Sequence, residues 1–161
     1  MPDSYAYVIR APNEYFFTSD FGSAYTIVFS PYRELKLSEN FQDSIFNVTL
    51  VSSAEKRPPK DYTVSRTVRD IFFDFFSKRN VCLIYMPDFS DGKHKIRNEL
   101  FKRWVKHYDL HDKFELISIE LEYEAHSLSI YTNIIYLKDY PFQNEVLAAF
   151  QRKIEEYEGI K

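Results

Sequence analysis

Glycine is scarce in this sequence: only Gly22, Gly92 and Gly159 occur among its 161 residues. Phosphate-binding loops of the Walker or Rossmann kind need clustered glycines, because their backbone N–H groups must approach the phosphates closely. Both kinds of nucleotide loop are therefore excluded. The sequence also has no glycine-flanked serine elbow, no His-Glu-x-x-His pattern and no internal repeat. We accordingly predict no catalytic residue and no bound cofactor.

Cysteine is equally rare, since Cys82 is the only one. A single cysteine excludes an internal disulfide, a multi-cysteine zinc ribbon and an iron–sulfur cluster. Cys82 lies within the apolar run VCLIYM, so we expect a buried thiol and not a nucleophile. The sequence shows neither an apolar leader after a basic start nor an uncharged run of about 18 residues, the length of a membrane span. These absences predict a cytoplasmic protein without membrane contact.

Aromatic residues, in contrast, are abundant: 15 Phe and 13 Tyr bring the aromatic fraction to 18%. Most of these rings should fill a core, but tyrosine also suits a contact surface because its tip is polar. The length fits a single domain, residues 1–161, around one core. The formal net charge of -3 supplies no global basic field for nucleic acid. We therefore expect a protein partner or a homodimer.

Periodicity and turn signals outline the fold. The predicted strands cover residues 4–10, 14–19, 23–30, 45–52, 81–86, 114–123 and 127–137, and the predicted helices cover 63–78, 93–108 and 141–159. A strand–helix–strand crossover makes two strands parallel, whereas hairpins on both sides make the others antiparallel. We predict an α+β fold with a mixed, mostly antiparallel sheet of about seven strands and three helices, in the order β-β-β-β-α-β-α-β-β-α.

The acidic loop PDFSDG joins the strand at 81–86 to a basic helix. Open α/β sheets place ligand sites where a strand delivers a loop to a helix N-terminus. The candidate anion or ligand loop comprises Asp88, Asp91, Gly92, Lys93 and Lys95. The alternative is structural: Asp88 would bond the loop, and Asp91 or Ser90 would cap the helix.

The basic helix has six Lys or Arg and one acid between Lys93 and Tyr108, whereas residues 109–124 carry six acids and one Lys. Its expected inner face comprises Ile96, Leu100, Phe101, Trp104, Val105 and Tyr108. The candidate basic surface comprises Lys102, Arg103 and Lys106. Nucleic-acid binding through residues 93–106 is the weaker alternative, because the neighbouring acids compete for these charges.

Two further groups of residues have alternative interpretations. Phe73 and Phe76 flank the apolar stripe of the helix at 63–78, so they form either a candidate partner surface or part of the core. His107 and His111 have the spacing of two zinc ligands, but the helix ends there and no third ligand is evident. We therefore predict no metal site, and we expect His94 and His126 to face solvent.

Three segments together resemble a family of small bacterial proteins of unknown function: EYFFTSDFGSAYTIVFS, DYTVSRTVRDIFFDFF and DGKHKIRNELFKRW. This resemblance implies a bacterial cytoplasmic protein and supplies no catalytic residue. The order of the elements is also similar to the later part of the GCN5-related N-acetyltransferase fold. In that family a glycine-bearing loop cradles the pyrophosphate of coenzyme A.

The corresponding segment here, EKRPPKDYTVSRTVRD, has Pro58 and Pro59 and lacks the glycines. Lys56, Arg57 and Lys60 could neutralise phosphates, but we expect coenzyme A binding to be weak or lost. The leading hypothesis is therefore a non-catalytic interaction protein. A divergent acyltransferase and a weak nucleic-acid binder are the alternatives.

Overall fold

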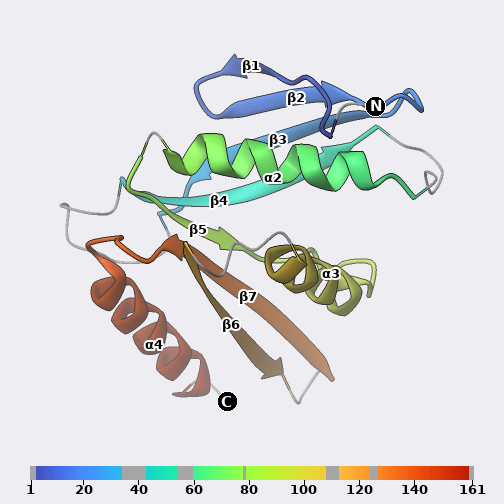
Figure 1. The fold of residues 1–161 in the computed structure, drawn as a ribbon. Coiled ribbons are helices and arrows are strands. Elements are labelled where there is room, and N and C mark those ends of the chain that lie inside the picture. Colours follow the sequence, from blue (N-terminus) through green and yellow to red (C-terminus); the bar gives the residue numbers. More distant parts are fainter. Residues whose placement is uncertain are drawn as a thin grey trace. The chain divides into compact units, whose positions relative to one another are not determined.

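The computed structural model describes residues 3–33, 43–53, 60–77, 79–107, 113–123 and 127–159. Among these residues, seven strands and three helices follow one another in the predicted order. The strands are β1 (Val8–Ala11), β2 (Glu14–Thr18), β3 (Ala24–Pro31), β4 (Ile45–Ser52), β5 (Cys82–Tyr85), β6 (Phe114–Tyr123) and β7 (Leu128–Leu137). The helices are α2 (Tyr62–Ser77), α3 (His94–His107) and α4 (Gln143–Gly159) (Figure 1).

The seven strands form one mixed sheet in the order β1-β2-β3-β4-β5-β7-β6. Antiparallel pairs join β1 to β2, β2 to β3, β5 to β7 and β6 to β7. β4 and β5 are parallel, with Ile45 opposite Cys82, because the chain between them crosses over through α2. The predicted α+β class and the mixed, mostly antiparallel sheet are confirmed.

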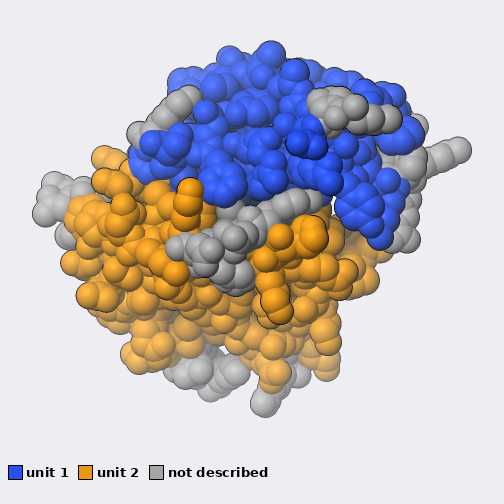
Figure 2. Space-filling view, viewed as in Figure 1, with its two compact units in different colours: residues 1–30, 48–79 blue, residues 31–47, 80–161 orange. Residues whose placement is uncertain are grey.

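The chain divides into two compact units, which Figure 2 colours separately. Unit 1 consists of Met1–Ser30 and Val48–Arg79, and unit 2 consists of Pro31–Asn47 and Asn80–Lys161. Unit 1 therefore contains α2 with β1 and β2, whereas unit 2 contains α3 and α4 with β5, β6 and β7. That residues 1–161 act as a single domain stays a prediction.

Unit 1 buries aromatic side chains between its strands and α2. Buried residues alternate along β2 and β3, namely Tyr15, Phe17, Tyr25, Ile27 and Phe29. The Phe29 ring stacks on Phe75 of α2 with centroids 3.9 Å apart. The Tyr15 hydroxyl donates a hydrogen bond to the Asp74 carboxylate at 2.9 Å. Much of the aromatic excess thus fills this core, and the buried tyrosine tip has a polar partner.

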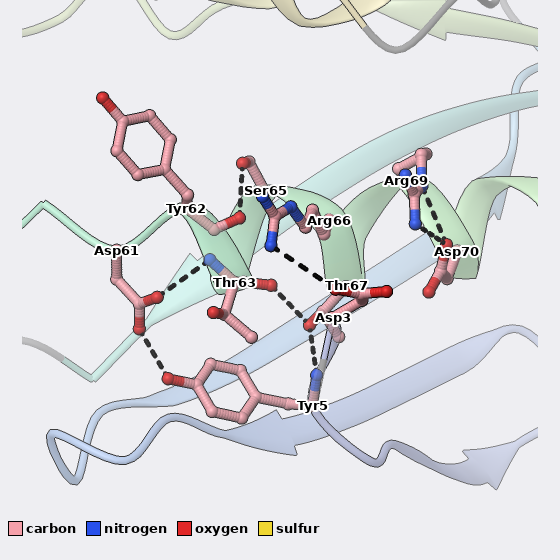
Figure 3. Close-up of polar contacts among 10 residues, drawn as sticks. All are labelled: Asp3, Tyr5, Asp61, Tyr62, Thr63, Ser65, Arg66, Thr67, Arg69 and Asp70. Carbon is pink, nitrogen blue, oxygen red and sulfur yellow. Dashed lines mark hydrogen bonds and ion pairs between the residues drawn. The ribbon is translucent and has the colours of Figure 1, made fainter. Parts of the chain in front are cut away.

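Asp61 caps the N-terminus of α2 (Figure 3). Its Oδ1 accepts a hydrogen bond from the Thr63 backbone N–H at 2.9 Å, and its Oδ2 accepts one from the Tyr5 hydroxyl at 2.7 Å. The backbone N–H of Tyr5 donates to the Thr67 hydroxyl oxygen at 2.8 Å. Side-chain hydrogen bonds therefore fix both the start of α2 and the segment that precedes β1.

Replacing Asp61 with alanine should lower the free energy of unfolding by about 1 kcal/mol, because the Thr63 N–H and the Tyr5 hydroxyl lose their acceptor. Asp61→Asn is the matched control, since its amide oxygen still accepts from Thr63. Urea denaturation of the three proteins measures the difference. An asparagine variant as unstable as the alanine variant would contradict the capping role.

In unit 2, α3 and α4 lie on opposite faces of β5, β6 and β7 (Figure 1). One face packs against α4 in a cluster that includes Cys82, Ile84, Ile134, Tyr136, Val146 and Phe150. The other face meets α3, where the Tyr85 ring lies 4.4 Å from that of Phe101. This division follows from strand geometry, because successive side chains point to opposite sides of a sheet.

Candidate functional site

The loop between β5 and α3 is held by its own hydrogen bonds. The Asp88 carboxylate accepts hydrogen bonds from the backbone N–H and from the hydroxyl of Ser90, both at 2.9 Å. These bonds hold the pKa of Asp88 below its usual value, and the bond from the Ser90 backbone N–H has the largest effect. Gly92 has a φ of 73°, a left-handed conformation that favours glycine. The Asp88 carboxylate therefore has its hydrogen-bond partners within the loop that precedes α3.

Asp91 caps the start of α3. Its Oδ1 accepts a hydrogen bond from the Lys93 backbone N–H at 3.0 Å, and the Arg97 guanidinium donates to both carboxylate oxygens. These contacts hold the pKa of Asp91 well below its usual range, and the hydrogen bond from Arg97 has the largest effect. Arg97 also donates to the Asp88 carbonyl at 2.9 Å. The Asp91 carboxylate therefore holds the residue before α3 and places a negative charge beside the start of the helix.

The structure brings the predicted loop residues Asp88, Asp91, Gly92 and Lys93 together, and Lys95 is exposed two residues after Lys93. Their contacts support the structural interpretation, in which the carboxylates bond the loop and cap the helix. Binding of an external anion by these residues stays a prediction.

Asp91→Asn tests the cap through its pH dependence. The pKa of Asp91 lies near 3.9 in the unfolded chain and lower in the folded protein. The stabilisation by the Asp91 carboxylate is therefore present above about pH 4 and is lost as the pH falls. The difference in melting temperature between wild type and D91N should therefore shrink between about pH 4 and pH 2. Circular dichroism melts at constant ionic strength measure it. A difference that stays constant over this interval would contradict the assignment.

The inner face of α3 agrees only in part with the predicted one, since Phe101 and Val105 are buried as predicted. Its buried residues are Asn98, Phe101 and Val105. Ile96 is 71% exposed and Leu100 is 40% exposed, so the prediction that both lie on the inner face is wrong. Trp104 is half-buried, and Tyr108 lies outside the described residues.

The rotation of α3 follows from a buried polar pair between α3 and β7. Asn133 Nδ2 donates to Asn98 Oδ1 at 2.7 Å, and the Ser118 hydroxyl donates to Asn133 Oδ1 at 2.8 Å. Asn133 is 0% exposed and Asn98 is 3% exposed. A buried amide without a partner costs about 1–3 kcal/mol, so the helix turns Asn98 toward the sheet. A lone Asn in the run SIYTNIIYL was the signal for this pair, which sequence reasoning missed.

Replacing Asn98 with alanine should lower the free energy of unfolding by about 1–3 kcal/mol, because the Asn133 amide loses its nearest acceptor while it stays buried. Glu99→Ala is the matched control on the same helix: its carboxylate is exposed and lies 4.0 Å from Lys102, so its loss should change stability by at most about 0.5 kcal/mol. Guanidinium denaturation compares the two variants with wild type. Equal effects of the two substitutions would show that the buried pair does not stabilise α3.

The outward side of α3 carries apolar and basic side chains next to each other. Ile96, Leu100 and Arg103 share one line along the helix, because they are four and three residues apart. Lys95, Glu99, Lys102 and Lys106 follow the adjacent line, and the Glu99 carboxylate lies 4.0 Å from the Lys102 ammonium. We call these seven residues the α3 outer face; it contains the predicted basic surface, Lys102, Arg103 and Lys106, and one acid. The structure thus adds two exposed apolar side chains to a surface that the sequence described as basic.

One of the two residues of the candidate partner surface on α2, Phe76, is buried in the structure. Phe76 is 2% exposed, and its ring centroid lies 6.3 Å from that of Phe75. Phe76 therefore belongs to the core of unit 1, which was the alternative interpretation. The physical reason is the width of the buried face of α2, which holds Ile71, Phe72, Phe75 and Phe76 together. Phe73 is half-buried.

The remaining candidate groups show no assembled reaction centre within the described part of the chain. Burial raises the pKa of the Cys82 thiol to about 12, so the nucleophilic thiolate is not populated near neutral pH. No three or more His, Cys, Asp or Glu side chains of the described residues are grouped to hold a metal. His107 is exposed, whereas His111, His126 and the paired-proline segment 54–59 lie outside the described residues.

His94 begins α3 and is half-buried, so it does not simply face solvent as predicted. Its ring centroid lies 5.7 Å from that of Tyr131, and its Nδ1 is buried without a hydrogen-bond partner among the described residues. None of the described helices combines the length and the apolar composition needed to cross a membrane.

A family model matches residues 60–152, and its description is Family of unknown function (DUF6169). No curated protein matches the chain. The predicted resemblance to a small family of unknown function is confirmed, whereas the bacterial origin stays a prediction. These comparisons give no support to the resemblance to GCN5-related N-acetyltransferases. Because the match covers more than half of the sequence, the chain belongs to the Family of unknown function (DUF6169).

Proposed function

We propose that this protein is a non-catalytic interaction module and that the α3 outer face is its contact surface. The observation that carries the proposal is Ile96, which is 71% exposed on a helix whose opposite side is packed against the sheet. Leu100, one turn further along, is 40% exposed. Fully burying a side chain of this size contributes about 1.5–3 kcal/mol, so a partner that covers both gains binding free energy.

The charges beside these side chains indicate an acidic partner. Lys95, Arg103 and Lys106 are all exposed. Cations around an apolar centre speed association with an acidic surface and set its orientation, while the apolar contact slows dissociation. Arg103 can in addition bind a carboxylate through two parallel hydrogen bonds. We therefore expect the partner to present carboxylates around an apolar side chain, as an acidic amphipathic helix does.

Nucleic acid fits this surface less well than an acidic protein does. A nucleic-acid strand would use the cations of the α3 outer face but would leave Ile96 and Leu100 without an apolar contact. Binding to single strands usually relies on exposed aromatic rings that stack on bases, and Trp104 is half-buried. Phosphate binding also weakens steeply as salt rises, whereas apolar contacts do not. Salt dependence therefore separates the two partners.

Ile96→Asp tests the contact surface, because it removes apolar area and adds a charge that repels an acidic partner. Wild type, I96D and Y62D are immobilised and exposed to nuclease-treated extract of the native host. Tyr62 is 59% exposed on α2, so Y62D is a matched surface control. We expect a protein that wild type and Y62D retain and that I96D retains at least about tenfold less. The purified partner should follow the same order in calorimetry.

Three results would contradict the proposal. The first is equal retention of the partner by wild type and folded I96D. The second is retention that disappears on nuclease treatment, which would favour nucleic acid. The third is a wild type that retains nothing and is a monomer in light scattering at micromolar concentration. A dimer that I96D abolishes would instead identify a second copy of the chain as the partner.

The cytoplasm is the compartment that we propose for this interaction. The motivation is the lone, buried Cys82, since proteins of oxidising compartments commonly carry paired cysteines. Fractionation of the native host checks this assignment, and recovery of the protein outside the cytoplasmic fraction would contradict it.

A further inference from the structure

The first and the last strand of the sheet differ in how their outer edges are protected. β1 is four residues long, and its register with β2 shifts between Ile9 and Ala11. β6 is ten residues long and pairs with β7 from Phe114 to Tyr123 without a shift (Figure 1). Natural proteins shorten or bulge exposed edge strands, because a long regular edge can pair with another chain. β6 has neither kind of protection.

The backbone of β6 presents alternate residues to its outer edge. The Lys138 N–H donates to the Lys113 carbonyl at 3.0 Å, one position before the pair of Phe114 and Leu137. In an antiparallel pair, residues bonded to the partner strand alternate with residues whose backbone groups point away. The odd-numbered residues of β6 therefore bond β7, whereas the even-numbered residues turn their N–H and C=O groups outward. Within residues 115–122, those are Leu116, Ser118, Glu120 and Glu122. Among the described residues, no strand pairs with this outer edge.

The odd-numbered side chains of β6 form a row on the face toward α4. Ile117, Ile119 and Leu121 belong to this row, because successive side chains of a strand alternate between the two faces. All three are half-buried, although Ile117 and Ile119 pack against the cluster beneath α4. A further strand beside β6 would therefore bury more apolar surface along this row.

The sequence pattern of β6 is self-complementary about Ile119. A two-fold axis perpendicular to the sheet at this residue pairs β6 with a second β6 in antiparallel orientation. It places Ile119 opposite its own copy and Ile117 opposite Leu121 of the other copy. These are non-hydrogen-bonded pairs, in which side chains approach each other most closely. The apolar row is then continuous across the two copies.

The charges of β6 favour the register centred on Ile119. In this register Glu120 lies opposite Ser118, and Glu122 lies opposite Leu116, so each of these exposed carboxylates faces an uncharged side chain. A register centred on Glu120 would place two carboxylates directly opposite each other, which destabilises a strand pair. A register centred on Ser118 keeps fewer apolar pairs in the row toward α4.

We propose that β6 pairs antiparallel with β6 of a second copy of this chain, centred on Ile119, and so forms a homodimer. The even-numbered residues from Leu116 to Glu122 then exchange about eight backbone hydrogen bonds with their opposite residues. These bonds hold the two strands together, and the apolar row fixes their register. The dimer surface is separate from the α3 outer face, for which we propose an acidic protein partner.

Light scattering coupled to size-exclusion chromatography tests the dimer through Glu120→Pro. Proline lacks the N–H that Glu120 turns outward, so E120P loses pairing with a second β6 while the bonds between β6 and β7 stay. Glu120→Thr is the matched control, because it removes the same carboxylate and keeps the N–H. At about 50 μM, wild type and E120T should be dimers, and folded E120P should be a monomer.

Disulfide trapping tests the register, and it also tests the dimer if E120P does not fold. Ile119→Cys places two thiols opposite each other, with Cβ atoms about 4.5–5.5 Å apart. Glu115→Cys is the matched control in the same row, because its two copies would lie about 26 Å apart along the paired strands. The native Cys82 is 0% exposed and does not interfere. With a mild oxidant, I119C should form a covalent dimer on non-reducing gels at least about tenfold faster than E115C.

Three results would overturn the proposal: a wild type that is a monomer up to about 200 μM, a folded E120P that stays a dimer, or an E115C that crosslinks as fast as I119C. Ile96 lies outside β6, so I96D should leave this dimer intact, and a wild-type dimer that I96D abolishes would also overturn the pairing through β6. A wild type that dimerises through β6 but retains no protein from the extract would contradict the α3 proposal alone. Failure of one proposal is therefore distinguishable from failure of the other.

Discussion

The antiparallel register of β5, β7 and β6 is the constraint on which the chemistry of unit 2 depends. Tyr85 pairs with Asn133 and Ile84 with Ile134, so polar and apolar side chains are sorted to opposite faces of the sheet. A slip of one residue would exchange these faces and would place the Asn133 amide in the apolar cluster beneath α4. The side of α3 that faces solvent is a consequence of this sorting.

On the face toward α3, the register fixes the position of a buried amide, and that amide orients the helix. Asn98 can satisfy Asn133 only when it points at β7, which leaves Ile96 on the solvent side. Asp91, three residues before the helix, is bonded to Arg97 of α3 and so ties the preceding loop to the helix. Orientation and starting point together determine which side chains the α3 outer face presents.

On the face toward α4, the same register places the Cys82 thiol in a core that also buries the Tyr140 hydroxyl. Burial raises the pKa of both the Cys82 thiol and the Tyr140 hydroxyl to about 12, and the Tyr140 hydroxyl is hydrogen-bonded to Ser44 at 2.6 Å. Both groups thus stay protonated near neutral pH.

The sequence by itself determined the elements and their order, because strand alternation, helix periodicity and turn residues act over a few neighbouring positions. The alternation of buried side chains along β3 and the aspartate before α3, Asp91, are examples that the structure contains. Only the tertiary structure decided which side of a helix is buried, since Asn98 finds its partner 35 residues away. It likewise decided that Phe76 is core and that Lys153 meets Tyr32, 121 residues away. Local patterns carry no information about such distant partners, and burial follows from those partners.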